Sequence, residues 1–80
     1  MPNPLHAPEY DRFRELLIGA RKKSGLSQAA LARRLAKPQS FVSKFERGER
    51  RLDVVEFASV AQALGLDPLR LLRRFYKEAR

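Results

Sequence analysis

Hydrogen-bonding side chains gather between residues 39 and 47, and they are the most informative chemical feature of the sequence. A helix over this segment would place five of them on its outer face: Gln39, Ser40, Ser43, Lys44 and Arg47. Val42 and Phe45, three residues apart, would form the inner, apolar face of the same helix. The segment therefore presents a row of hydrogen-bond donors and acceptors together on one short helix.

Two short helices joined by a tight turn are needed to position this row. The first is predicted over about residues 28–35, with the side chain of Ser27 accepting a hydrogen bond from a free N–H group of the first turn. The second is predicted over about residues 38–47. Pro38 suits the first helical position, where no backbone N–H is needed, and Gly48 suits the left-handed position that ends a helix.

Three sequence motifs carry a family resemblance that covers about residues 13–72. They are L-S-Q-x-x-L-A at residues 26–32, F-V-S-K-F-E-R-G-E-R at residues 41–50 and A-L-G-L-D-P at residues 63–68. In this order and spacing, the segment resembles the helix-turn-helix of the lambda-repressor/Cro-like (XRE-type) DNA-binding family. The chain departs from the family pattern at Ala36, where glycine is usual in the turn, and at Pro38, where serine usually caps the second helix.

The resemblance implies that the second helix of the motif enters the major groove of B-DNA, where base edges carry a distinct pattern of donors and acceptors. The residues then expected to contact bases are Gln39, Ser40, Ser43 and Lys44. Those expected to contact the DNA backbone are Gln28, Phe41, Arg47, Arg50 and Arg51. For each of them the alternative is a solvated surface side chain, and Phe41 could instead pack locally.

The family pattern also implies an ion pair between Arg21 and Glu46. A bare carboxylate beside DNA would be repelled, so Glu46 is expected to align the recognition helix through Arg21. A plain surface glutamate is the alternative.

The distribution of charge supports a polyanionic partner. The net charge is +8, and no Asp or Glu occurs between Leu16 and Phe45, where seven Lys and Arg residues lie. Such segregation indicates one positive surface that attracts a polyanion, here double-stranded DNA.

Length and composition exclude several other classes of protein. Eighty residues form one small domain with a modest core. The chain has no Cys and one His, so no disulfide, cofactor or metal site is expected, and it has no Gly-rich phosphate loop, so an enzyme is not expected. It has no apolar run of membrane-spanning length and no signal-peptide pattern. We expect a cytoplasmic protein of bacterial or phage-like type, associated with the nucleoid when bound to DNA and with no membrane contact.

The fold expected is all-α, a compact five-helix lambda-repressor-like domain. Residues 1–8, with three prolines, are predicted to be a flexible arm, and residues 9–80 to form the helix-turn-helix domain. Helices are predicted over about residues 9–24, from an Asp53–Glu56 capping box, and from Asp67-Pro68. Their predicted core-facing residues are Phe13, Leu17, Ala20, Val54, Phe57, Val60, Ala61 and Leu64.

We therefore interpret the chain as a sequence-specific transcriptional regulator, a repressor or autoregulator that binds DNA as a homodimer. The surplus apolar face of the last helix, Leu71 and Phe75, is the predicted dimer seam, unless Tyr10, Phe13 or the arm covers it. A protein-interaction module, such as the antitoxin of a toxin–antitoxin pair with its own protein partner, is the alternative function.

Overall fold

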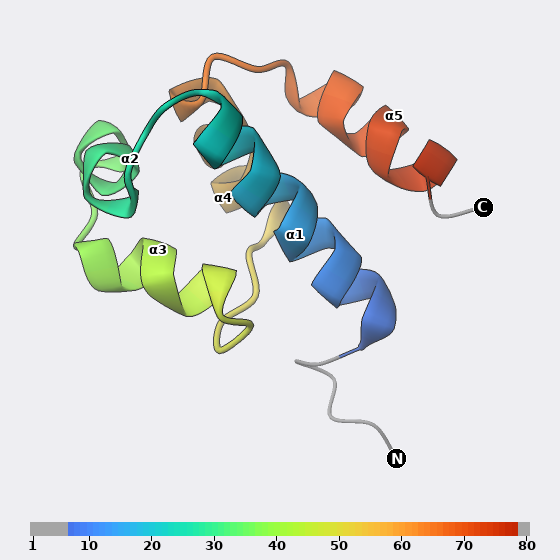
Figure 1. Cartoon of the computed structure of the whole chain (residues 1–80), viewed down its shortest axis with the longest axis horizontal. Coiled ribbons are helices and arrows are strands. Elements are labelled where there is room, and N and C mark those ends of the chain that lie inside the picture. Colours follow the sequence, from blue (N-terminus) through green and yellow to red (C-terminus); the bar gives the residue numbers. More distant parts are fainter. Residues whose placement is uncertain (1–6, 79–80) are drawn as a thin grey trace.

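The computed structural model describes residues 7–78 and contains, within them, five helices and no strand. The helices are α1 (Pro8–Lys23), α2 (Gln28–Leu35), α3 (Gln39–Glu46), α4 (Val54–Ala63) and α5 (Pro68–Glu78) (Figure 1). The expected all-α fold is confirmed. None of these helices has the length and apolar character needed to cross a bilayer. The predicted arm lies outside the described residues up to position 6, and α1 begins at Pro8, inside the range predicted for that arm.

Side-chain caps fix where three of the helices begin. The Ser27 hydroxyl accepts a hydrogen bond of 3.0 Å from the Ala30 backbone N–H. Asp53 and Glu56 form the predicted capping box, in which each side chain accepts a hydrogen bond from the backbone N–H of the other residue. The Asp67 carboxylate accepts a hydrogen bond of 3.0 Å from the Leu69 backbone N–H. Each cap satisfies a backbone donor that the helix itself leaves without a partner.

The turn between α2 and α3 differs from the prediction. Pro38 is the N-cap of α3, with extended backbone angles, so the helix begins one residue later than expected. Ala36 ends α2 in the left-handed region, at a φ of 56°. An L-residue is disfavoured there by about 1 kcal/mol, because its Cβ crowds the carbonyl oxygen. Gly48, beyond the other end of α3, has a φ of 78° at no such cost.

The core lies where α1 and α4 meet the helix-turn-helix pair. Its largest fully buried side chains are Phe45, Leu17, Leu31, Val42 and Val60. Burying each of them stabilises the fold by roughly 2 kcal/mol before entropy is counted. α2 packs against α3 and α4, and α1 contacts both α3 and α5. Figure 1 accordingly shows α1 between α3 and α5.

Two predictions of which apolar side chains are buried are wrong. Val54 is 73% exposed, because it lies at the first turn of α4, to one side of the stripe formed by Phe57, Val60 and Leu64. Leu71 is 5% exposed and belongs to the core, because α5 turns its Leu71 face toward α4 and α1. The apolar side chains that α5 leaves in solvent are instead Leu69 and Tyr76.

Candidate DNA-binding surface

The outer face of α3 carries the predicted base-contacting side chains, because Val42 and Phe45 hold its inner face in the core. Gln39, Ser40 and Lys44 are exposed. Their side chains make no hydrogen bond or ion pair with any other residue between 7 and 78. Ser43 is half-buried, and its hydroxyl donates a hydrogen bond of 3.3 Å to the Ser40 carbonyl. Three of the four side chains are thus uncommitted, and Ser43 lies behind them.

Behind α3, Glu46 is buried and fully paired. Arg21 Nε donates to Glu46 Oε2 at 2.7 Å, and Arg21 Nη2 donates to Oε1 at 3.1 Å. Gln28 Nε2 also donates to Glu46 Oε1, at 2.9 Å. The expected Arg21–Glu46 pair therefore exists, and its two-point geometry fixes the orientation of both side chains. A buried carboxylate needs such partners, because ionised oxygens without hydrogen bonds are expensive to bury.

Arg21 and Arg14 extend this network into the backbone. Arg21 Nη1 donates to the Leu26 carbonyl at 2.8 Å, just before α2. Arg14 Nη1 donates to the Glu46 carbonyl at 2.6 Å, at the end of α3. The two arginines of α1 thereby connect that helix to both helices of the motif. The sequence did not predict this contact of Arg14, since no local pattern pairs residues 14 and 46.

The three predicted phosphate-binding arginines after α3 are each engaged within the protein. Arg47 pairs with Glu49 at 2.7 Å, and both side chains are more than half exposed. Arg50 pairs with Glu56 through two hydrogen bonds of 3.0 and 2.6 Å. The Arg51 guanidinium lies 4.6 Å from the centre of the Tyr10 ring. These contacts hold the arginines in place, and the two ion pairs offset part of their charge.

Glu56 both caps α4 and pairs with Arg50. It caps α4, which the sequence predicts, and it also binds Arg50, which the sequence does not show. The hydrogen bonds from Arg50 and from the Asp53 backbone lower the pKa of Glu56 from 4.5 to about 2. Glu56 therefore stays ionised even in mildly acidic solution, and its ion pair holds Arg50 beside α3.

Phe41 forms a half-buried platform under two cations. Its ring packs edge-on against Phe45, with the ring centres 5.7 Å apart. Arg50 lies 4.7 Å and Lys37 5.6 Å from the centre of the Phe41 ring. Both distances are within the range of cation–π attraction. The local packing considered for Phe41 is thus present, and its ring also positions positive charge at the edge of α3.

The predicted dimer seam is only partly at the surface. Leu71 is buried within one chain, which removes it as a contact residue. Phe75 is half-buried, and its ring packs edge-on against Phe13 at 5.6 Å between centres. Phe75, Leu72 and Tyr76 line a groove of about 550 Å³ beside the N-terminal part of α1. The large apolar side chains of α5 that remain exposed are instead those of Leu69 and Tyr76.

Comparisons with known proteins also indicate a helix-turn-helix in this part of the chain. A helix-turn-helix family model matches residues 17–71. An XRE-family like protein from Pseudomonas syringae pv. tomato strain DC3000 is 44% identical, with a TM-score of 0.86 over 90% of this chain and 88% of that one. The restriction-modification controller protein C.AhdI from Aeromonas hydrophila is 32% identical, with a TM-score of 0.74 over 81% of this chain and 98% of that one.

A more distant structure shares the fold alone. The restriction-modification controller protein C.Esp1396I, as a tetramer in complex with its natural 35 base-pair operator, is 18% identical, with a TM-score of 0.82 over 91% of this chain and 96% of that one. None of the curated proteins compared with the chain is significantly similar to it. Together the matches favour a regulator over the protein-interaction module that the sequence left open.

Proposed function

The chain belongs to the XRE-type helix-turn-helix family of DNA-binding transcriptional regulators, and from this premise we propose that it recognises a specific operator as a homodimer. In this proposal α3 lies in the major groove, the N-terminus of α2 faces the DNA backbone, and the protein has no catalytic role. Its effect on transcription is that of a repressor or autoregulator.

One observation carries the proposal: α3 is fixed rigidly on one side and left uncommitted on the other. Its inner side is held by Val42, Phe45 and the network around Glu46. Its outer side presents Gln39, Ser40 and Lys44 to solvent. A rigid helix with free polar side chains suits the major groove, which admits a helix and presents donors and acceptors to it.

The side chains divide into two roles. Gln39 can bind adenine at two points and Lys44 can donate to the acceptors of guanine, with Ser40 and Ser43 beside them. The residues that would contact the backbone are Gln28, Phe41, Arg47, Arg50 and Arg51. Phosphate contacts fix the position of the protein without reading sequence. Phosphate would compete with Glu49 and Glu56 for the guanidinium groups of Arg47 and Arg50, and such exposed pairs exchange partners at little cost.

Dimerisation follows from the small footprint of one domain. Two recognition helices about 34 Å apart would read the two halves of a near-palindromic site. We place the dimer seam on Leu69 and Tyr76, extending over Leu72 and Phe75. The operator-bound tetramer of C.Esp1396I, which shares the fold, supports multimeric binding.

Two substitutions on α3 test the division of roles. Sites would first be selected from a random pool of duplexes, and binding to a selected and a random duplex would then be titrated at several salt concentrations. Lys44→Ala should weaken binding to the selected duplex by roughly tenfold and bring it closer to that for the random duplex. Arg47→Ala should weaken both alike and reduce the salt slope by about one.

Lys22→Ala is the matched control, since Lys22 is exposed at the end of α1 and is not among the residues proposed to contact DNA. It should leave the preference between the two duplexes unchanged. Identical behaviour of Lys44→Ala and Arg47→Ala, or equal binding of the unmodified protein to every duplex, would overturn the proposal.

A further inference from the structure

A groove between α1 and α5 is separate from the DNA-binding surface, since α1 lies between α3 and α5 (Figure 1). The groove has a volume of about 420 Å³, which is within the range of protein ligand sites. Leu16 and Ala20 of α1 and Phe75 of α5 contribute apolar side chains to its lining. The proposed contacts with DNA use none of these residues, and only Phe75 among them also belongs to the proposed dimer seam.

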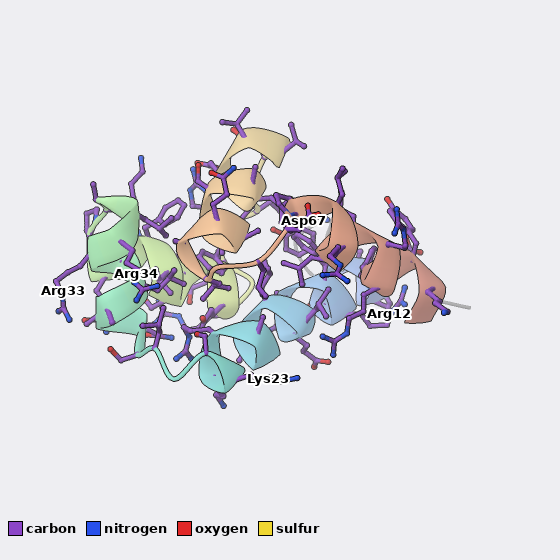
Figure 2. The ribbon with its side chains drawn as sticks, turned by 90° about the horizontal axis from the view of Figure 1, so that it is seen from above. Arg12, Lys23, Arg33, Arg34 and Asp67 are labelled. Atoms are coloured by element: carbon purple, nitrogen blue, oxygen red, sulfur yellow. The ribbon has the colours of Figure 1, made fainter. Side chains whose placement is uncertain are left out.

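Cations surround this apolar floor. Arg12, Lys23 and Arg74 line the groove, and Glu15 is its one acidic lining residue. Figure 2 shows Arg12 and Lys23 toward opposite ends of α1, so positive charge lies at both ends of the groove. The Arg12 guanidinium is 5.4 Å from the centre of the Phe75 ring, which holds it at the edge of the floor. Arg70 lies beyond Arg74 in an adjoining depression on α5.

Gly19, in the middle of α1, keeps the groove open. Glycine inside a helix is unfavourable relative to alanine, because it loses more backbone freedom on folding. Within residues 7–78, packing does not require glycine here, since a Cβ atom at Gly19 would meet nothing within 4 Å beyond its chain neighbours and the backbone of α1 itself. The missing side chain instead leaves room for another molecule to approach the backbone of α1.

We propose that this groove binds an amphipathic acidic segment of another protein, with apolar side chains on its floor and carboxylates beside Arg12, Lys23 and Arg74. The chemistry of the groove selects this occupant. A DNA duplex presents phosphates but no apolar side chains to fill the floor. A second copy of this chain has a net charge of +8 and would bring few carboxylates to these cations, and the proposed dimer seam places it on the Leu69 and Tyr76 side of α5 instead. The groove would let the regulator hold a protein partner while α3 stays on DNA.

A synthetic peptide provides the probe. It would be a helical peptide of about 15 residues, in which glutamates flank two leucines spaced i, i+4. Fluorescence anisotropy would measure its affinity, and amide chemical-shift changes would locate it on the full chain. We expect saturable binding with shifts centred on Gly19, Ala20 and Phe75, and no comparable binding of a peptide with lysine in place of glutamate or glutamine in place of leucine.

Three variants test the site. Gly19→Leu should abolish peptide binding by filling the groove, while binding to a selected DNA duplex stays within about twofold of the unmodified protein, because α3 is untouched. Lys23→Glu should weaken peptide binding roughly fivefold, through the loss of one attraction and the gain of one repulsion. Lys22→Glu is its matched control, because it makes the same charge change on the neighbouring exposed residue, which lies outside the groove. It should weaken peptide binding by about twofold or less.

Equal effects of Lys22→Glu and Lys23→Glu would show attraction to net charge alone and would overturn the proposal. Unchanged binding of the peptide to Gly19→Leu, or amide chemical-shift changes centred on α3, would also overturn the proposal. A lower oligomeric state of Gly19→Leu in light scattering would assign the groove to a second copy of the chain. If the unmodified protein bound selected and random duplexes equally, the proposed function would be wrong, but the result for the peptide would still hold.

Discussion

Two of the arginine–glutamate pairs around α3, Arg21–Glu46 and Arg50–Glu56, differ in how far water reaches them. The side chains of Arg21 and Glu46 are 11% and 6% exposed, whereas those of Arg50 and Glu56 are 40% and 22% exposed. Both pairs have two-point geometry, so hydrogen-bond count does not distinguish them. Burial distinguishes them. Removing one partner would leave an unpaired charge inside the protein in the Arg21–Glu46 pair, but a charge in contact with water in the Arg50–Glu56 pair. The buried pair braces the helix, while the exposed pair orders an arginine beside it.

The largest expected effect breaks the buried pair. Arg21→Ala should lower the free energy of unfolding by about 3 kcal/mol, because Glu46 would keep its burial and lose its main partner. Urea denaturation followed by circular dichroism would measure this. Arg33→Ala, at an exposed position of α2, is the control and should change stability by less than about 0.5 kcal/mol. Equal effects of the two substitutions would show that Glu46 does not depend on Arg21.

A smaller effect is expected from the amide that shares Glu46. Gln28→Ala should cost about 1 kcal/mol, because Arg21 still donates to both carboxylate oxygens when the Gln28 hydrogen bond is lost. Gln62→Ala removes the same side chain from an exposed site on α4 and should be nearly neutral. Urea denaturation would measure the free energy of unfolding of both variants. A larger loss of stability in Gln28→Ala than in Arg21→Ala would show that Gln28, and not Arg21, is the main partner of Glu46.

The smallest expected effect on stability concerns the exposed pair and depends on pH. The folded-state pKa of Glu56 is about 2, below its ordinary 4.5, so ionised Glu56 stabilises the fold above pH 4.5. That contribution should be lost as the pH falls from 4.5 toward 2. Glu56→Gln should remove it, while glutamine can still accept the capping hydrogen bond from Asp53.

Unfolding free energies measured between these two pH values, at low and at high salt, would test this expectation. The difference between the unmodified protein and Glu56→Gln should shrink as the pH falls. It should also shrink as salt is added, because an exposed pair is screened. The contribution of Arg21 should respond much less to salt. A salt response of equal size for both pairs would contradict the distinction drawn between them.

The sequence predicted most helix ends, because the interactions that set them are local. Ser27, Asp53 and Asp67 cap helices within three residues of themselves, so their roles follow from sequence spacing alone. The placement of Val42 and Phe45 follows from helical periodicity in the same way. The outer face of α3 was therefore predictable once its inner face was known.

Contacts between distant segments were not predictable in this way. Spacing does not connect Arg14 to the Glu46 carbonyl, and nothing local marks Glu56 as the partner of Arg50. Arg21–Glu46 was expected only through the family resemblance. On α5, periodicity offered two apolar faces, and only the packing of α1 and α4 decided that Leu71 is buried and Leu69 is not.

The left-handed conformation of Ala36 has a consequence for how the motif keeps its shape. Two backbone hydrogen bonds, from the Ala36 N–H to the Arg33 carbonyl and from the Lys37 N–H to the Ala32 carbonyl, close the end of α2 around this conformation, but they do not set the angle between α2 and α3. The buried Val42 and Phe45 and the Glu46 brace set that angle, and the turn is held against its own preference. A protein loosened behind α3 would therefore relax first at Ala36, and its two short helices would lose their mutual alignment before either of them unwinds.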